Sequence, residues 1–122
     1  MQVLIVDDDE RLLGLLDRWI TAAGYDVVTC TRFEDARRYL ATNAPAILLA
    51  EVRLGAFNGL QLVLVAKGAN PAVGAIVLSG YDDPVLRREA KVQGAFYLLK
   101  PITREQLFEC LSTLAPAVPT TS

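Results

Sequence analysis

Short apolar runs alternate along this chain with longer segments in which apolar residues recur every three or four positions. A run of four or five apolar residues is typical of a strand buried on both faces, and the wider spacing is typical of an amphipathic helix. The pattern predicts strands at 3–6, 26–30, 46–50, 75–78 and 96–99. It predicts helices at 10–23, 33–42, 59–67 and 84–92, and a last helix that ends at residue 114.

Several of these predicted helices have start or stop signals at their ends. Asp9 and Asn58 are candidate N-caps, and Asp83 is a candidate N-cap that a proline follows directly. Residues 103–106 read Thr-Arg-Glu-Gln, which is a capping box. Gly24 follows the first predicted helix and is a candidate stop signal. Local sequence signals therefore predict several of the helix boundaries.

Five predicted strands alternate with five predicted helices. This order is typical of a parallel sheet with helices on both faces and right-handed crossovers. We expect an α/β fold of the doubly wound, flavodoxin-like (βα)5 type with strand order 2-1-3-4-5. A length of 122 residues fits a single domain, which we place at 1–114, followed by a linker-like tail at 115–122 that is rich in Pro and Thr.

The composition excludes several classes of protein. The formal net charge is -2, so nothing draws the chain generally to nucleic acid, and no apolar stretch is long enough to span a membrane. The chain has no histidine, which excludes histidine-based catalysis and His-ligated metal sites. Its two cysteines lack metal-site spacing. The amino terminus lacks the features of a secretory signal, so we expect a cytoplasmic protein without a disulfide framework.

Polar residues follow four of the predicted strands at the point where each strand ends. They are the pair Asp7 and Asp8, then Glu51, Ser79 and Lys100. Each of them alone is ordinary at a strand end, but in the predicted sheet all four strand ends meet at one edge. Clustered carboxylates suit Mg²⁺, and a lysine and a hydroxyl beside them suit a phosphoryl group. The sequence thus predicts a phosphoryl and magnesium site at this edge.

The chain resembles the receiver domain of bacterial two-component response regulators. The resemblance runs from residue 3 to residue 114 and rests on four motifs: IVDDDE, EVRLGAFNG, LSGYDD and YLLKP. It implies that Asp7 and Asp8 hold Mg²⁺ together with Glu51 and the backbone carbonyl of Arg53. Magnesium binding is expected to be weakened or altered by Glu51.

The same resemblance assigns roles to three further residues. It implies that Ser79 follows the phosphoryl group, that Lys100 pairs with it, and that Tyr97 is a switch aromatic. At the phosphoacceptor position, where the family has an aspartate, this chain has Glu51. Two hypotheses follow: Glu51 imitates a phosphorylated aspartate by extending toward Lys100 and Ser79, or Glu51 is inert and the domain is a binding module. In either case the domain is expected to be no enzyme.

The resemblance also implies a protein-binding face formed by the fourth helix, fifth strand and fifth helix (α4-β5-α5 in the family's numbering). Charged side chains of both signs are expected there, namely Arg87, Arg88, Lys91, Glu105 and Glu109. They are equally well explained as solvated helix charges. Expected partners are a histidine kinase or other signalling protein, a second copy of the chain, and an output domain after residue 122. No direct nucleic acid binding and no membrane association are expected.

A second interpretation is a small Mg-dependent phosphohydrolase similar to the haloacid-dehalogenase family. In it Asp7 is the nucleophile and Asp9 the general acid, with Asp82 or Asp83 on the metal. The motif lacks the Thr or Val expected after the second aspartate, and the chain has no insertion to cap a substrate pocket. Turnover of a generic phosphate ester separates this interpretation from a binding module.

Overall fold

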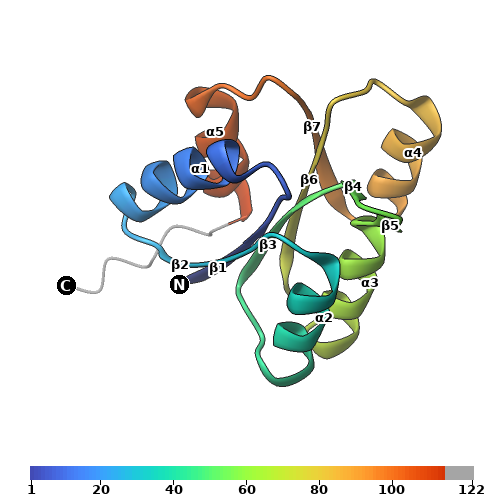
Figure 1. Ribbon diagram of the computed structural model, residues 1–122, viewed down its shortest axis with the longest axis horizontal. Helices are drawn as coiled ribbons and strands as arrows, with labels where there is room; N and C mark the ends of the chain where they lie inside the picture. Colours follow the sequence, from blue (N-terminus) through green and yellow to red (C-terminus); the bar gives the residue numbers. More distant parts are fainter. Residues whose placement is uncertain (115–122) are drawn as a thin grey trace.

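A computed structural model describes residues 1–114 of the chain, and one parallel sheet forms its centre (Figure 1). The strand order in this sheet is β2-β1-β3-β6-β7, so the predicted flavodoxin-like order is confirmed. The strands are β1 (Gln2–Val6), β2 (Asp26–Cys30), β3 (Ile47–Glu51), β6 (Gly74–Ser79) and β7 (Ala95–Leu99). The predicted tail at 115–122 lies outside the described residues.

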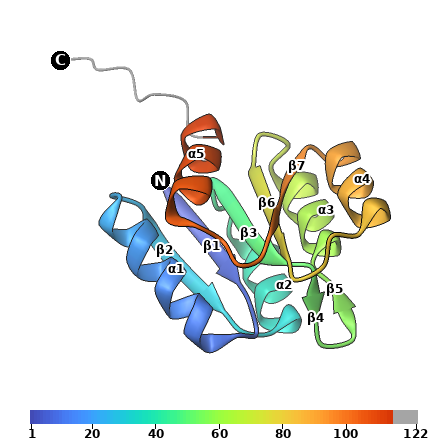
Figure 2. The same ribbon diagram turned by 90° about the horizontal axis from the view of Figure 1, so that it is seen from above.

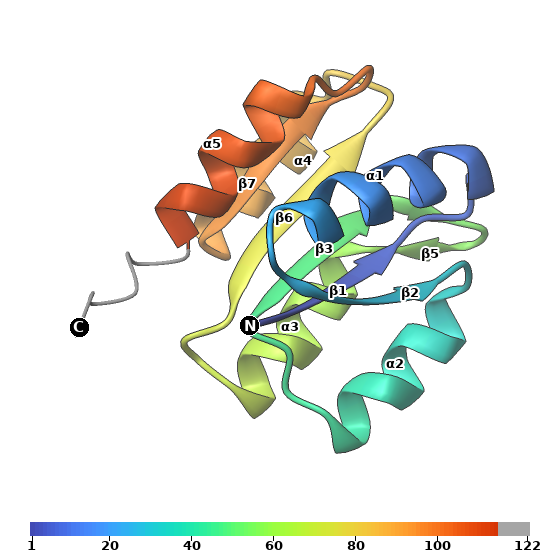
Figure 3. The same cartoon turned by 90° about the vertical axis from the view of Figure 1, so that its left-hand side faces the viewer.

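Five helices cover the two faces of the sheet, as Figures 1 and 3 show. On one face lie α1 (Glu10–Ala22) and α5 (Arg104–Leu114), and on the other lie α2 (Phe33–Thr42), α3 (Leu60–Ala69) and α4 (Pro84–Val92). Within residues 1–114, no helix has the length and apolarity needed to cross a membrane.

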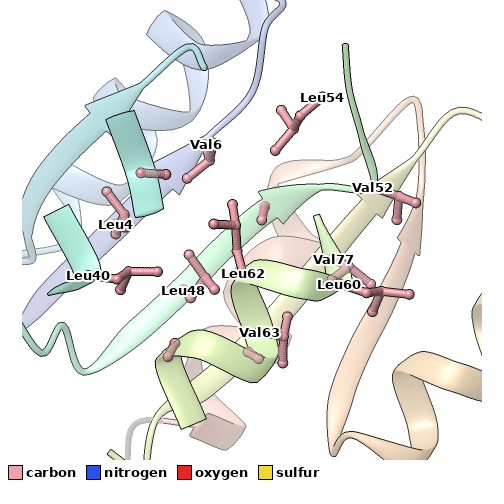
Figure 4. Close-up of a cluster of buried hydrophobic side chains, with 14 of the residues drawn as sticks. Leu4, Val6, Leu40, Leu48, Val52, Leu54, Leu60, Leu62, Val63 and Val77 are labelled. Carbon is pink, nitrogen blue, oxygen red and sulfur yellow. The ribbon is translucent and has the colours of Figure 1, made fainter. Parts of the chain in front are cut away.

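A hydrophobic core lies on each face of the sheet. The central strands contribute side chains to both cores, because successive side chains of a strand point to opposite faces. In β3, Leu48 packs toward α2 and α3 (Figure 4) and Ala50 belongs to the same cluster, whereas Ile47 and Leu49 pack toward α1 and α5. All four of these side chains are buried. An apolar run without polar alternation is therefore what a central parallel strand requires.

Local capping signals are largely confirmed. The Asp9 carboxylate accepts from the backbone N–H of Arg11 and Leu12 and so caps α1. Asp83 caps α4 with Pro84 at the first turn. The capping box at the start of α5 closes reciprocally, with its two hydrogen bonds at 3.0 and 3.1 Å.

The predicted cap of α3 is shifted by one residue. Gly59, not Asn58, is the N-cap of α3, and it already has helical φ and ψ. The Asn58 side chain still accepts from the Leu60 N–H at 2.8 Å. Glycine allows the start of α3 to lie against the end of β3, because a Cβ at position 59 would collide with the Glu51 carbonyl oxygen.

The structure adds a small hairpin that the sequence pattern did not predict. The segment after β3, expected to be a loop, contains β4 (Arg53–Leu54) paired antiparallel with β5 (Phe57–Asn58). Gly55 makes the turn at φ +62°, a backbone conformation that favours glycine. Figure 2 shows the hairpin beyond the carboxyl end of β3. Two-residue strands are too short for period-two alternation to reveal them.

Candidate functional site

Backbone pairing brings the ends of β1 and β3 side by side. Val6 is paired with Ala50, so the next residues, Asp7 and Glu51, lie at the same level on adjacent central strands. The Asp7 N–H also donates to the Cys30 carbonyl at 3.1 Å, which extends the sheet by one more bond. Asp7 is fully buried, and Glu51 is only 6% exposed. The fold thus holds two carboxylates out of water at the edge of the sheet.

Lys100 reaches both carboxylates from the end of β7. Its backbone N–H donates to the Ser79 carbonyl at 2.7 Å, which aligns the residue with the end of β6. Its Nζ lies 3.1 Å from Asp7 Oδ2 and also forms an ion pair with Glu51 Oε2. The structure therefore brings together Asp7, Glu51 and Lys100, three of the predicted site residues.

Burial and charge act in opposite directions on this cluster. Burial raises the pKa of Glu51, and this outweighs the lowering by Lys100 and by the backbone N–H of Arg53. Burial lowers the pKa of Lys100, but its contacts with Glu51 and Asp7 outweigh that effect and raise it overall. Lys100 therefore stays protonated, and Glu51 takes up a proton at a higher pH than an exposed glutamate does.

The two predicted switch residues both meet the backbone of Tyr81 instead of the carboxylates. The Ser79 hydroxyl donates to the Tyr81 carbonyl at 2.9 Å and accepts from the Tyr81 N–H at 3.1 Å. The Tyr97 hydroxyl donates to the same carbonyl at 2.6 Å. Ser79 and Tyr97 are thereby linked through the loop between β6 and α4.

Two arginine side chains contact aromatic rings at this loop, and the sequence did not predict these contacts. The Arg53 guanidinium lies 4.4 Å from the centre of the Tyr81 ring. Arg87 lies 4.7 Å from the centre of the Tyr97 ring and forms an ion pair with Asp82 at 2.9 Å. The two arginine–ring contacts join residues from different elements, so no local signal could have identified them.

The residues predicted to hold magnesium do not converge as a ligand set. Asp8 is exposed, whereas Asp7 and Glu51 face Lys100. Over residues 1–114, no three acidic or thiol side chains gather closely enough to hold a metal ion. As arranged, the site does not fit Mg²⁺, and the magnesium assignment stays a prediction for experiment.

The geometry gives no support to a phosphohydrolase. Asp7, the predicted nucleophile, is fully buried. A cavity of about 280 Å³ lies nearby, but its lining includes Asp8 and Phe57 and not Asp7. Asp82 and Asp83, the predicted metal ligands, are instead engaged by Arg87 and by the first turn of α4.

Comparison with known proteins agrees with this fold. Residues 3–112 match the family model described as the response regulator receiver domain. The DNA-binding transcriptional regulator NtrC of Salmonella typhimurium is 36% identical over 103 residues, which are 81% of this chain and 21% of that protein. The transcriptional regulatory protein GlrR of Escherichia coli is 29% identical over 110 residues, or 89% of this chain and 25% of that protein. The chain thus spans about a fifth to a quarter of these curated relatives.

Solved structures show the same architecture. A response regulator receiver protein from Sinorhizobium medicae aligns with a TM-score of 0.86 at 25% identity, covering 93% of each chain. A response regulator protein from Burkholderia pseudomallei, solved with a phosphorylated aspartic acid, a calcium ion and citrate, aligns with a TM-score of 0.83 at 27% identity over 92% of this chain and 66% of that one. Because of this family match and these alignments, we conclude that the chain belongs to the response regulator receiver domain family of two-component signalling.

Proposed function

We propose that this receiver domain signals without being phosphorylated, because Glu51 stands at the phosphoacceptor position and is a poor acceptor there. The observation that carries the proposal is the contact between the Glu51 carboxylate and Lys100. Glu51 presents to Lys100 a negative oxygen of the kind that a phosphorylated aspartate would present. The single negative charge of this carboxylate thereby replaces part of the charge that a phosphoryl group would bring to Lys100.

The length of the side chain argues against efficient phosphorylation of Glu51. Glutamate is one methylene longer than aspartate, and misplacing a reacting atom by about 1 Å can cost about a hundredfold in rate. Glu51 is also only 6% exposed, and its Oε1 accepts from the Arg53 N–H at 3.3 Å. An incoming phosphorus would have to displace Lys100 or this backbone contact.

A protein-binding role is proposed for the face formed by α4, β7 and α5. β7 is an edge strand of the sheet. Large apolar side chains are exposed on α4 and β7, namely Val85 (70%), Val92 (81%), Phe96 (36%) and Leu99 (38%). Arg88 and Lys91 on α4 and Glu105 and Glu109 on α5 are exposed charges of opposite sign. Such a surface favours a self-complementary contact with a second copy of the chain.

The longer relatives suggest where the signal goes. NtrC and GlrR are transcriptional regulators, and the matched region is a fifth to a quarter of each. We propose that a histidine kinase or another signalling protein acts on this domain from upstream, and that an output domain after residue 122 is its downstream partner.

Intact-mass measurement after incubation with Mg²⁺ and a small acyl-phosphate donor tests the proposal. We expect no adduct on the native chain and one phosphoryl adduct on Glu51→Asp, with Glu51→Gln as the control that lacks a nucleophile. A phosphoryl adduct on Glu51 of the native chain would overturn the proposal. Absence of labelling on both the native chain and Glu51→Asp would overturn the claim that Glu51 alone blocks the reaction.

A further inference from the structure

Two buried carboxylate oxygens in this domain depend on one ammonium group. Among the described residues, Asp7 Oδ2 and Glu51 Oε2 have no partner with hydrogen-bond geometry. Both oxygens are nevertheless within ion-pair distance of Lys100 Nζ. Two carboxylates brought together away from water repel each other unless a cation lies between them. Lys100 is that cation in this structure.

The other two oxygens of these carboxylates also have partners within the chain. Asp7 Oδ1 accepts from the Asp9 N–H at 2.9 Å, and Glu51 Oε1 accepts from the Arg53 N–H at 3.3 Å. Every oxygen of Asp7 and Glu51 is thus hydrogen-bonded or ion-paired. A metal ion would have to break one of these contacts and would meet the positive charge of Lys100 at close range.

We propose that Lys100, by bridging Asp7 and Glu51, takes the place of the divalent cation, so that this receiver domain is closed to Mg²⁺ while that bridge is intact. Magnesium gives up its water reluctantly and usually binds through one or two carboxylates, whereas the oxygens of Asp7 and Glu51 already have partners within the chain. The extra methylene of Glu51 lets its carboxylate reach the ammonium. This inference rests on the proposed function of Glu51, but it makes a separate claim, which is that the native chain does not bind Mg²⁺.

Removing the lysine should therefore create a metal site. In Lys100→Ala, Asp7 and Glu51 keep their backbone contacts and lose their common cation. Their two freed oxygens then face each other across the volume of the missing ammonium. The absence of Lys100 should lower the thermal midpoint in chelator, and Mg²⁺ should restore part of that loss.

Thermal unfolding of the full 122-residue chain in chelator and in about 10 mM Mg²⁺ tests this. We expect the native midpoint to move by less than about 1 °C and that of Lys100→Ala to rise by about 3 °C or more in Mg²⁺. Lys67→Ala is the matched control. Lys67 donates to the Val73 carbonyl next to the start of β6, at the opposite edge of the sheet, so its response should equal the native one.

A native midpoint that rises in Mg²⁺ as much as that of Lys100→Ala would overturn the inference. Calorimetric titration of the native chain with Mg²⁺ keeps the test valid if Lys100→Ala does not fold, because stoichiometric binding would equally refute it. The result is separable from the proposed function. Phosphorylation of Glu51 would refute that function, whereas magnesium binding to an unphosphorylated native chain refutes only this inference.

Discussion

Gly59 places the start of α3 directly against the backbone carbonyl of Glu51, and of the glycines in residues 1–114 it leaves the least room for a Cβ. A Cβ at this position would lie 1.9 Å from the Glu51 carbonyl oxygen and 2.9 Å from its carbon. The Gly59 N–H also donates to the Val52 carbonyl at 2.6 Å, which locks the turn to the strand end. Both obstacles are main-chain atoms, which cannot rotate away.

The cost of Gly59→Ala is purely steric. Gly59 has φ −60° and ψ −21°, which alanine adopts without strain. To reach ordinary contact at 3.4 Å, the turn and the strand end must separate by about 1.5 Å in a close-packed region. Overpacking costs about 1–3 kcal/mol, and we expect the upper end because backbone must move. A loss of about 3 kcal/mol corresponds to about 12 °C in the thermal midpoint of a domain this size.

Thermal and urea denaturation of Gly59→Ala and Gly68→Ala measure this effect. Gly68 lies in the same helix, and its added Cβ meets nothing within 4 Å. The control should gain about 0.5–1 kcal/mol, because alanine is the better helix former. Opposite signs for one substitution within one helix would isolate the contact with Glu51. A Gly59→Ala variant as stable as the native chain would refute the reasoning.

Two further predictions concern the pH dependence and the self-association of the domain. Burial raises the pKa of Glu51 in the folded protein above the ordinary value of 4.5. Protonation of Glu51 therefore favours the folded state; this contribution to the free energy of unfolding is complete below pH 4.5 and is lost as the pH rises through the raised pKa. Urea denaturation from about pH 4 to about pH 8 should show native stability falling relative to Glu51→Gln, and a constant difference would contradict this. Val92→Glu should abolish a dimer formed through α4, β7 and α5, because Val92 is 81% exposed on α4. Sedimentation velocity measures this, and a native chain that is monomeric at about 100 μM would rule out the dimer.

Much of the fold was predictable because its signals are local. The strand β2 and the helices α2 and α4 lie at their predicted residues, since apolar runs and helical spacing are set by which side chains must be buried. Trp19, by contrast, has the helical phase of a core residue but is only half-buried against the α1–α5 side of the sheet. Helical phase predicts the direction of a side chain, whereas its depth depends on how closely neighbouring helices approach.

Sequence alone determined which residues stand at the strand ends, because each apolar run shows where its strand ends and the doubly wound fold has a typical strand order. The sequence thereby predicted a cluster of Asp7, Asp8, Glu51, Ser79 and Lys100, of which the structure brings Asp7, Glu51 and Lys100 into contact. Only the tertiary structure decided how they pair: Lys100 bridges both carboxylates, whereas Ser79 turns toward Tyr81. The choice depends on side-chain rotamers and on the level at which separate strands end. Those are set by packing across the whole sheet and have no signature in a short stretch of sequence.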